Sequence, residues 1–429
     1  MTRRAAGAPS AARLAVAAAL ALAPAMVAEA RQASGEPQVV VEIRVHGNHA
    51  TPDADVLLIA GVTIGQPIEA STILEAETRL RKSGRFADVE IRKRFRSMES
   101  TADVVLVVVV QEHPVPDVGP LTPLWPLRRF AGRLQFLPVF NYVDGYGPTY
   151  GGRVTVARAL GRDGRLSIPV TWGGTKRAAL ELDKGFASGP IDRLEGGASI
   201  SRRENPYFHL DDDRAQVWLG VRRRLAGPVS AGGGAGYADV SFNGVNDRLA
   251  TYRADVTLDT RTDPLFPRNA VFASVSWDGL DPRRSPYANR LRVDARGYRG
   301  LIGQSVLSLR WQYGVSSAAL PPYEKFLVGG AGSLRGYRAG SFAGDKLMAA
   351  TAEVRVPLSS PLGISRAGIS VFADVAAACD HGARLVDTRF RPGGGAGVFL
   401  VASILNLSLD VGVREGGHVR VHFTTGLQF

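Results

Sequence analysis

The chain has 429 residues, enough for two or three ordinary domains, and carries a formal net charge of +12. Glycine accounts for 49 of the 429 residues, about 11%, which exceeds the average usage of about 7%. Charged residues make up 21%, which is close to normal. Only the extreme N-terminus is continuously apolar, so the composition excludes both a disordered chain and a bundle of membrane-spanning helices.

The N-terminal segment predicts export. Its apolar run, Leu14–Ala25, is too short to cross a bilayer as a helix, which takes about 20 residues. Arginines precede this run, and Ala28-Glu29-Ala30 after it is typical of a cleavage site. We therefore expect residues 1–30 to be a secretory signal peptide that takes no part in the fold.

Export narrows the meaning of the positive charge. Loss of the signal peptide, with its three arginines and one glutamate, lowers the net charge from +12 to +10. The single cysteine, Cys379, excludes an internal disulfide framework. Because an exported chain rarely meets nucleic acid, we expect no such partner and interpret the charge as attraction to anionic lipid headgroups or as simple solubility.

Residues 38–112 predict a small domain with the order β-α-α-β-β. Apolar residues at helical spacing follow Ser71, strands are expected at 39–45, 86–95 and 103–111, and the last of these contains a strongly β-branched run at 104–110. The join between the second helix and the second strand reads Gly-x-Phe-x-x-Val, at Gly84, Phe86 and Val89. This order and this join resemble a POTRA domain, the periplasmic module that precedes a family of outer-membrane barrels.

The resemblance implies how the domain meets its partners. POTRA domains receive client polypeptides by strand addition at an open sheet edge, and accessory periplasmic proteins are further expected partners. The basic run at 92–96 is expected to be a solvated face, with a membrane-facing surface as the alternative. Five prolines in the next stretch prevent a helix or a ladder, so residues 113–133 are predicted to be a linker.

From Leu134 to the end of the chain, apolar and polar residues alternate with a period of two. In one example, Leu407, Leu409 and Val411 alternate with Ser408 and Asp410. A soluble sandwich shows the same pattern, but the several charges on many polar faces favour a closed barrel in lipid. The fold class expected for residues 134–429 is therefore a transmembrane antiparallel β-barrel of about 16 strands in the bacterial outer membrane.

The C-terminal segment supports a barrel. One face of the last predicted strand is apolar, and its members are Val419, Val421, Phe423, Leu427 and Phe429. Such a terminal strand resembles the insertion signal of bacterial outer-membrane proteins. We expect it to close the barrel against the first strand, near residues 134–140.

A glycine-rich segment at 329–340 indicates which family of barrels the chain resembles. Its centre, Leu334-Arg335-Gly336-Tyr337, resembles a loop motif of the BamA/TamA (bacterial surface antigen) family. In that family the loop folds into the lumen, and its arginine contacts acidic residues of the inner wall. The resemblance assigns these partners to Asp374, with Phe372 beside it, and to Glu353. Ala376 stands where the family usually has glycine.

A second match, Asp259 to Pro267, resembles a strand-turn segment of the same family, and its prolines predict a role in topology. The resemblance implies a protein that assembles, inserts or translocates polypeptides at the outer membrane without catalysis, with membrane lipid and unfolded clients as partners. A transporter that secretes a single polypeptide is the alternative, and an outer-membrane enzyme is a third. No nucleophile elbow or dinucleotide loop occurs, and we expect neither cofactor nor metal.

Overall fold

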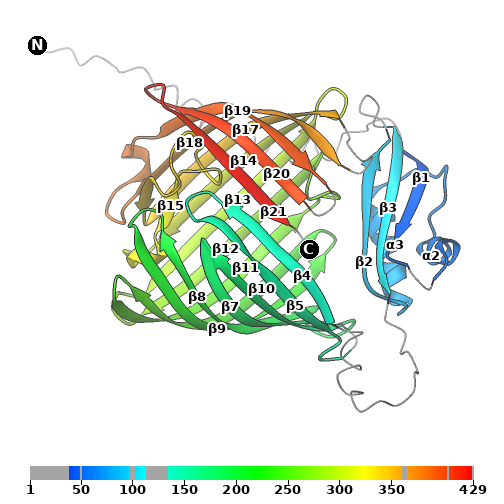
Figure 1. The fold of residues 1–429 in the computed structure, drawn as a ribbon, viewed down its shortest axis with the longest axis horizontal. Coiled ribbons are helices and arrows are strands. Elements are labelled where there is room, and N and C mark those ends of the chain that lie inside the picture. The colour runs from blue at the N-terminus through cyan, green and yellow to red at the C-terminus, as the bar shows by residue number, and fades with distance from the viewer. Residues whose placement is uncertain are drawn as a thin grey trace, which may run out of the picture.

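The structure is a computed structural model, and its described residues fall into seven ranges: 38–48, 51–96, 102–112, 134–161, 163–359, 365–402 and 405–427. The expected signal peptide (1–30), the expected linker (113–133) and Phe429 lie outside these ranges. Two parts are described, an N-terminal domain and a barrel (Figure 1).

The N-terminal domain has the predicted order of elements. They are β1 (Val39–His46), α2 (Asp53–Ala60), α3 (Ala70–Lys82), β2 (Phe86–Phe95) and β3 (Asp103–Glu112). In the sheet, β3 lies between β1, which runs parallel to it, and β2, which runs antiparallel. Phe86 and Val89 of the predicted join are buried in the core, where they pack with α3 residues such as Leu80.

The barrel is a closed antiparallel sheet of sixteen strands, which confirms the predicted fold class. Its strands are β4 (Leu134–Val143), β5 (Gly147–Ala157), β6 (Gly164–Gly173), β7 (Thr175–Gly185), β8 (Arg193–Asn205), β9 (Leu210–Ala226), β10 (Val229–Phe242), β11 (Val245–Asp259), β12 (Ala270–Pro282), β13 (Ala288–Gly300), β14 (Val306–Ser316), β17 (Lys346–Ser359), β18 (Arg366–Cys379), β19 (Arg391–Val401), β20 (Leu405–Arg414) and β21 (Val419–Leu427).

The alternation in the sequence separates an outer from an inner wall. On β18, Val371 is 59% exposed on the outside, whereas its neighbour Phe372 is 4% exposed and faces inward. Exposed apolar residues recur in this way around the barrel, as expected of a wall covered by hydrocarbon. Within the described ranges, every helix is too short or too polar to serve as a membrane span.

The longest described connection between barrel strands, residues 317–345, joins β14 to β17. It contains η1 (Pro322–Glu324) and a two-stranded ribbon of β15 (Phe326–Val328) and β16 (Phe342–Gly344). A second short helix, η2 (Leu385–Asp387), lies between β18 and β19. Both connections emerge at the barrel end opposite the N-terminal domain, because the antiparallel strands alternate in direction from β4 onward.

The N-terminal domain contacts the barrel through β2. Arg94 forms a buried ion pair with Asp263, which lies in the connection between β11 and β12. Asp263 also accepts a hydrogen bond from Arg366 at the start of β18 (3.2 Å). Burial at this junction lowers the pKa of Lys93, and the guanidinium of Arg268 adds to the effect. The prediction of a solvated basic face is therefore wrong at Arg94, because the barrel covers it.

Candidate functional site

The glycine-rich segment at 329–340 packs against the inner wall. Leu334 and Tyr337 are buried in an apolar cluster with Val328 of β15 and the wall residues Ala349 and Ala376. Ala376, where the family resemblance predicts glycine, is fully buried in this cluster. Its methyl group therefore contributes to the contact between loop and wall.

Arg335 projects from this loop into a ring of carboxylates. Its Nε and Nη2 atoms donate to the two oxygens of Asp374 (2.9 and 3.0 Å), and its backbone N–H donates to the same carboxylate (2.9 Å). Nη1 donates to Glu353 (2.7 Å), and the guanidinium lies 3.4 Å from the centroid of the Phe372 ring. The structure thus brings together the residues that the motif singled out.

The sequence reasoning missed one member of this ring. Asp410 on β20 lies 3.5 Å from Nη1 of Arg335, and both residues are buried. A buried guanidinium is costly to desolvate, and three carboxylates with a bidentate contact compensate that cost. The arrangement holds a loop against a wall.

Gly336 attaches the same loop to the last strand. Its φ of 91° lies in the left-handed region, and a Cβ atom there would come within 3.0 Å of the backbone of Val413 and Arg414. Its N–H donates to Nε2 of His422 on β21 (2.9 Å). A glycine is needed here because the loop backbone packs directly on β20, where the facing residue is Gly412.

His422 carries the contact on to the first strands of the barrel. Its Nδ1 lies 2.5 Å from the carboxylate of Asp144, in the turn after β4, and the His422 side chain is fully buried. Asp144 also accepts the N–H of Ala331 from the loop (3.2 Å). Sequence reasoning missed both residues. The available signal was the inward position of His422, between the outward Val421 and Phe423.

The junction of β21 with β4, which we call the seam, is sparsely paired. Thr425 and Tyr142 are its only ladder pair among the described residues, whereas β4 and β5 pair from Leu134 to Val143. The ring of Phe423 adds an aromatic contact with Tyr142 at 5.4 Å between centroids. The seam therefore joins the two predicted strands, but its pair lies beyond the expected stretch 134–140. Leu427 pairs through its backbone with Leu405 on β20.

The buried carboxylates near the loop are paired with cationic side chains. Among the described residues, no three His, Cys, Asp or Glu side chains gather in a way that could hold an ion. The buried carboxylates around Arg335 are engaged by guanidinium groups, including that of Arg355, which donates to Glu353 (2.5 Å). The site is a set of attachments between a loop, a wall and a seam.

These features define a class of protein: an outer-membrane β-barrel with a luminal loop and an N-terminal POTRA domain. Residues 190–429 match the Omp85 superfamily domain, and residues 38–113 match the POTRA family described as surface antigen variable number repeat. The chain belongs to the Omp85 superfamily, and it is an outer-membrane protein whose POTRA domain lies in the periplasm.

Solved structures show the same fold. BamA from Haemophilus ducreyi lacking POTRA domains 1–3 is 16% identical with a TM-score of 0.62, covering 91% of this chain and 84% of that one. CdiB from Acinetobacter baumannii is 14% identical with a TM-score of 0.52, covering 91% and 74%. CdiB from Escherichia coli is 12% identical with a TM-score of 0.51, covering 92% and 91%. A search of curated protein sequences finds no match.

Proposed function

We propose that this protein inserts or translocates polypeptides at the outer membrane without catalysis. In this mechanism the POTRA domain receives a client strand in the periplasm, and the seam opens to template that strand into the membrane. The loop lock at Arg335, Gly336 and Tyr337 keeps the lumen closed while the seam works. Phe423 and Leu427 of β21 belong to the insertion signal and to the seam, and Phe429, outside the described residues, completes the proposed insertion signal.

The observation that carries this proposal is that the described residues of β21 and β4 form a single ladder pair. Each unpaired backbone group in hydrocarbon costs several kcal/mol, so a strand edge with few partners favours a new strand. The neighbouring junction of β20 with β21 is paired from Leu405 to Val413. The contrast makes the seam the place where the wall separates at the smallest cost.

The POTRA sheet offers one edge for the incoming strand. On the outer edge of β2, Glu77 accepts the N–H of Ile91 (2.8 Å), and Arg81 donates to the carbonyl of Val89 (2.6 Å). The outer edge of β1 carries a described bridge only at Val39, to Pro67. Val40 on this edge is also engaged, because its N–H donates to the carbonyl of Gln66 (3.0 Å) and its carbonyl accepts the N–H of Gly65 (2.7 Å). The edge of β1 beyond Val40 therefore supports strand addition better than that of β2.

Locking the seam tests the proposal. In a Cys379→Ala background, Tyr142→Cys and Thr425→Cys place two thiols on directly opposed residues. We expect the oxidised protein to lose insertion of a client barrel into proteoliposomes and the reduced protein to regain it. The control couples Ile369→Cys with Val398→Cys, an opposed pair across β18 and β19. Full insertion by the oxidised seam variant would reject the templating mechanism.

Secretion of one polypeptide through the lumen is the second candidate. A hollow of about 520 Å³ lies in the lumen and is lined by charged side chains that include Arg177, Arg253 and Arg290. The fold shared with CdiB is compatible with either candidate. The same locked seam separates them, because a lumen pathway continues when the seam is closed.

A further inference from the structure

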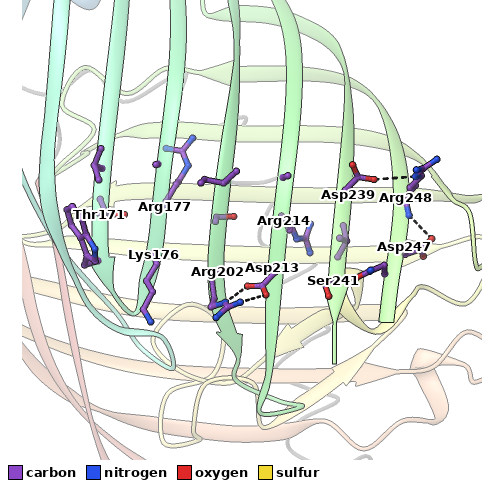
Figure 2. A pocket seen from close by; sticks show the side chains of 18 of the residues that line it. Thr171, Lys176, Arg177, Arg202, Asp213, Arg214, Asp239, Ser241, Asp247 and Arg248 are labelled. Atoms are coloured by element: carbon purple, nitrogen blue, oxygen red, sulfur yellow. Dashed lines mark hydrogen bonds and ion pairs between the residues drawn. The ribbon is translucent and has the colours of Figure 1, made fainter. Parts of the chain in front are cut away.

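A groove of about 1140 Å³ lies at the barrel end opposite the POTRA domain, across strands β6 to β11 (Figure 2). Most of its lining side chains share the outward face. Ile200 is 64% exposed and Trp172 is 53% exposed. On β7, Lys176 and Ala178 lie on the same face of the strand as the outward Leu180. The groove is therefore on the wall that faces lipid, and it is separate from the luminal site.

Strand register arranges the lining in two rows. Directly opposed residues on successive strands form the row nearer the barrel end: Lys176, Arg202, Asp213, Ser241 and Asn246. The row beneath it consists of Val170, Ala178, Ile200, Ala215, Asp239 and Arg248. Ala178, Ala215 and Ser241 form a floor of small residues within these rows. Lys176 on β7 and Arg248 on β11 stand on its two sides, and the Arg202 side chain lies between them.

Positive charge dominates this surface. Arg202 is neutralised by a bidentate contact with Asp213 (2.5 and 2.6 Å), and Arg248 lies 3.4 Å from Asp239. Lys176 is exposed and has no acidic partner among the described residues. Arg283 and Arg284, in the connection after β12, line the same groove and are also exposed. On the outward face and in the connection after β12, five cations thus face two carboxylates, and Asp247, the third carboxylate of the lining, is buried.

The level of the groove along the barrel indicates what meets it. Exposed aromatic side chains lie toward the same end of the barrel: Trp172 near the end of β6, Tyr237 in the second half of β10, and Tyr287 directly before β13. Aromatic girdles mark the membrane interface of outer-membrane barrels, where phosphate-bearing headgroups lie. Cations beside such a girdle face headgroups of the outer leaflet, since this end points away from the periplasm.

We propose that this groove binds the phosphate groups of an outer-leaflet lipid headgroup. Lys176 and Arg248, on opposite sides of the hollow, contact the phosphates, while the floor of small residues accommodates the body of the headgroup. Bound lipid would hold strands β7 to β11, which carry the groove, in place relative to one another. This assignment rests on the outer-membrane location and is independent of how client polypeptides are handled.

Binding of a bisphosphorylated lipid A to the purified full-length protein in detergent tests the assignment, by native mass spectrometry and by the shift in unfolding temperature. The variant Lys176→Gln/Arg248→Gln removes one cation from each side. We expect about 30-fold weaker binding, since each cation near anionic lipid contributes about 1 kcal/mol. The matched control, Arg384→Gln/Arg389→Gln, removes two exposed arginines from the connection between β18 and β19 and should bind as the wild type does.

Two further arms decide the chemistry. The same glycolipid without phosphates should bind no better to the wild type than to the groove variant, and inorganic phosphate alone should leave the unfolding temperature unchanged. Equal binding by wild type and groove variant, or equal binding of the dephosphorylated lipid, would overturn the proposal. If the double variant unfolds without lipid, the single variant Lys176→Gln serves, because its amine has no partner to lose.

Discussion

Two junctions of the same barrel differ in how they are held. The ladder between β17 and β18 runs from Lys346 to Ser359, and the loop adds Arg335 to its inner face. The seam between β21 and β4 has one described ladder pair, an aromatic contact and the contact of His422 with Asp144. A full ladder secures the first junction and the Arg335 side chain adds to it, whereas side chains provide most of the described contacts of the second.

The loop touches both junctions through consecutive residues. The Arg335 side chain donates hydrogen bonds to Glu353 on β17 and Asp374 on β18, while the N–H of Gly336 donates to His422 on β21, at the seam. Side-chain contacts are easier to exchange than a ladder, because each involves a single pair of groups. The barrel thus concentrates its reversible contacts where the proposed mechanism requires opening.

The largest effect is expected from removal of the Arg335 guanidinium, which contacts the junction between β17 and β18. Arg335→Ala leaves three buried carboxylates without their shared cation, and we expect a loss of about 3–5 kcal/mol in the free energy of unfolding. Urea titration of the folded protein in detergent measures it. Arg335→Lys keeps the charge without the bidentate fork, so it should lose less. An unchanged unfolding midpoint for both variants would show that the loop does not stabilise this wall.

A third attachment, at the periplasmic end, should be independent of both junctions. Arg94→Ala removes the POTRA partner of Asp263 and leaves Arg366 in place, at an expected cost of about 2–3 kcal/mol to docking. Spin labels on the two domains should report a broader distance distribution, with the unfolding midpoint of the barrel unchanged. The exposed Arg96 provides the control as Arg96→Ala. A narrow distribution in Arg94→Ala would mean that other contacts suffice.

A methyl group on the loop should weaken its hold on the seam. Gly336→Ala forces a side chain into a left-handed backbone and against β20, for an expected loss of about 2 kcal/mol. The Tyr142→Cys/Thr425→Cys disulfide should then form at a different rate from that in the parent. Gly332→Ala is the matched control, since its Cβ would meet nothing within 4 Å. Identical rates of disulfide formation in the two variants would show that the loop does not influence the seam.

The sequence predicted what depends on local pattern. Alternation gave the barrel, and the motif around Arg335 pointed to Asp374 and Glu353, which the structure places at 2.9 and 2.7 Å. Asp410 and His422 were missed because their relation follows from register: they are directly opposed on β20 and β21. Nothing local distinguishes an inward carboxylate that meets the loop from one that meets water.

Contacts between segments far apart in the sequence could not be predicted from local pattern at all. Asp144 and His422 are 278 residues apart, and only closure of the barrel brings them together. Arg94 was expected in solvent, because a run of basic residues carries no information about a second domain. The groove on the outer wall arises in the same way, from cations on separate strands that the register aligns.

The smallest effect is expected at the seam itself. Asp144→Asn preserves the shape of the side chain but removes the charge that faces the buried His422, at an expected cost of about 1 kcal/mol. The seam should open more often, which hydrogen exchange would register as about 5-fold faster exchange of the amides of Tyr142 and Thr425. Asp387→Asn, at an exposed site in the connection between β18 and β19, should leave those amides unchanged. If exchange in Asp144→Asn stays at the wild-type rate, the ladder pair and the aromatic contact alone hold the seam, and the side-chain latch has no role in its opening.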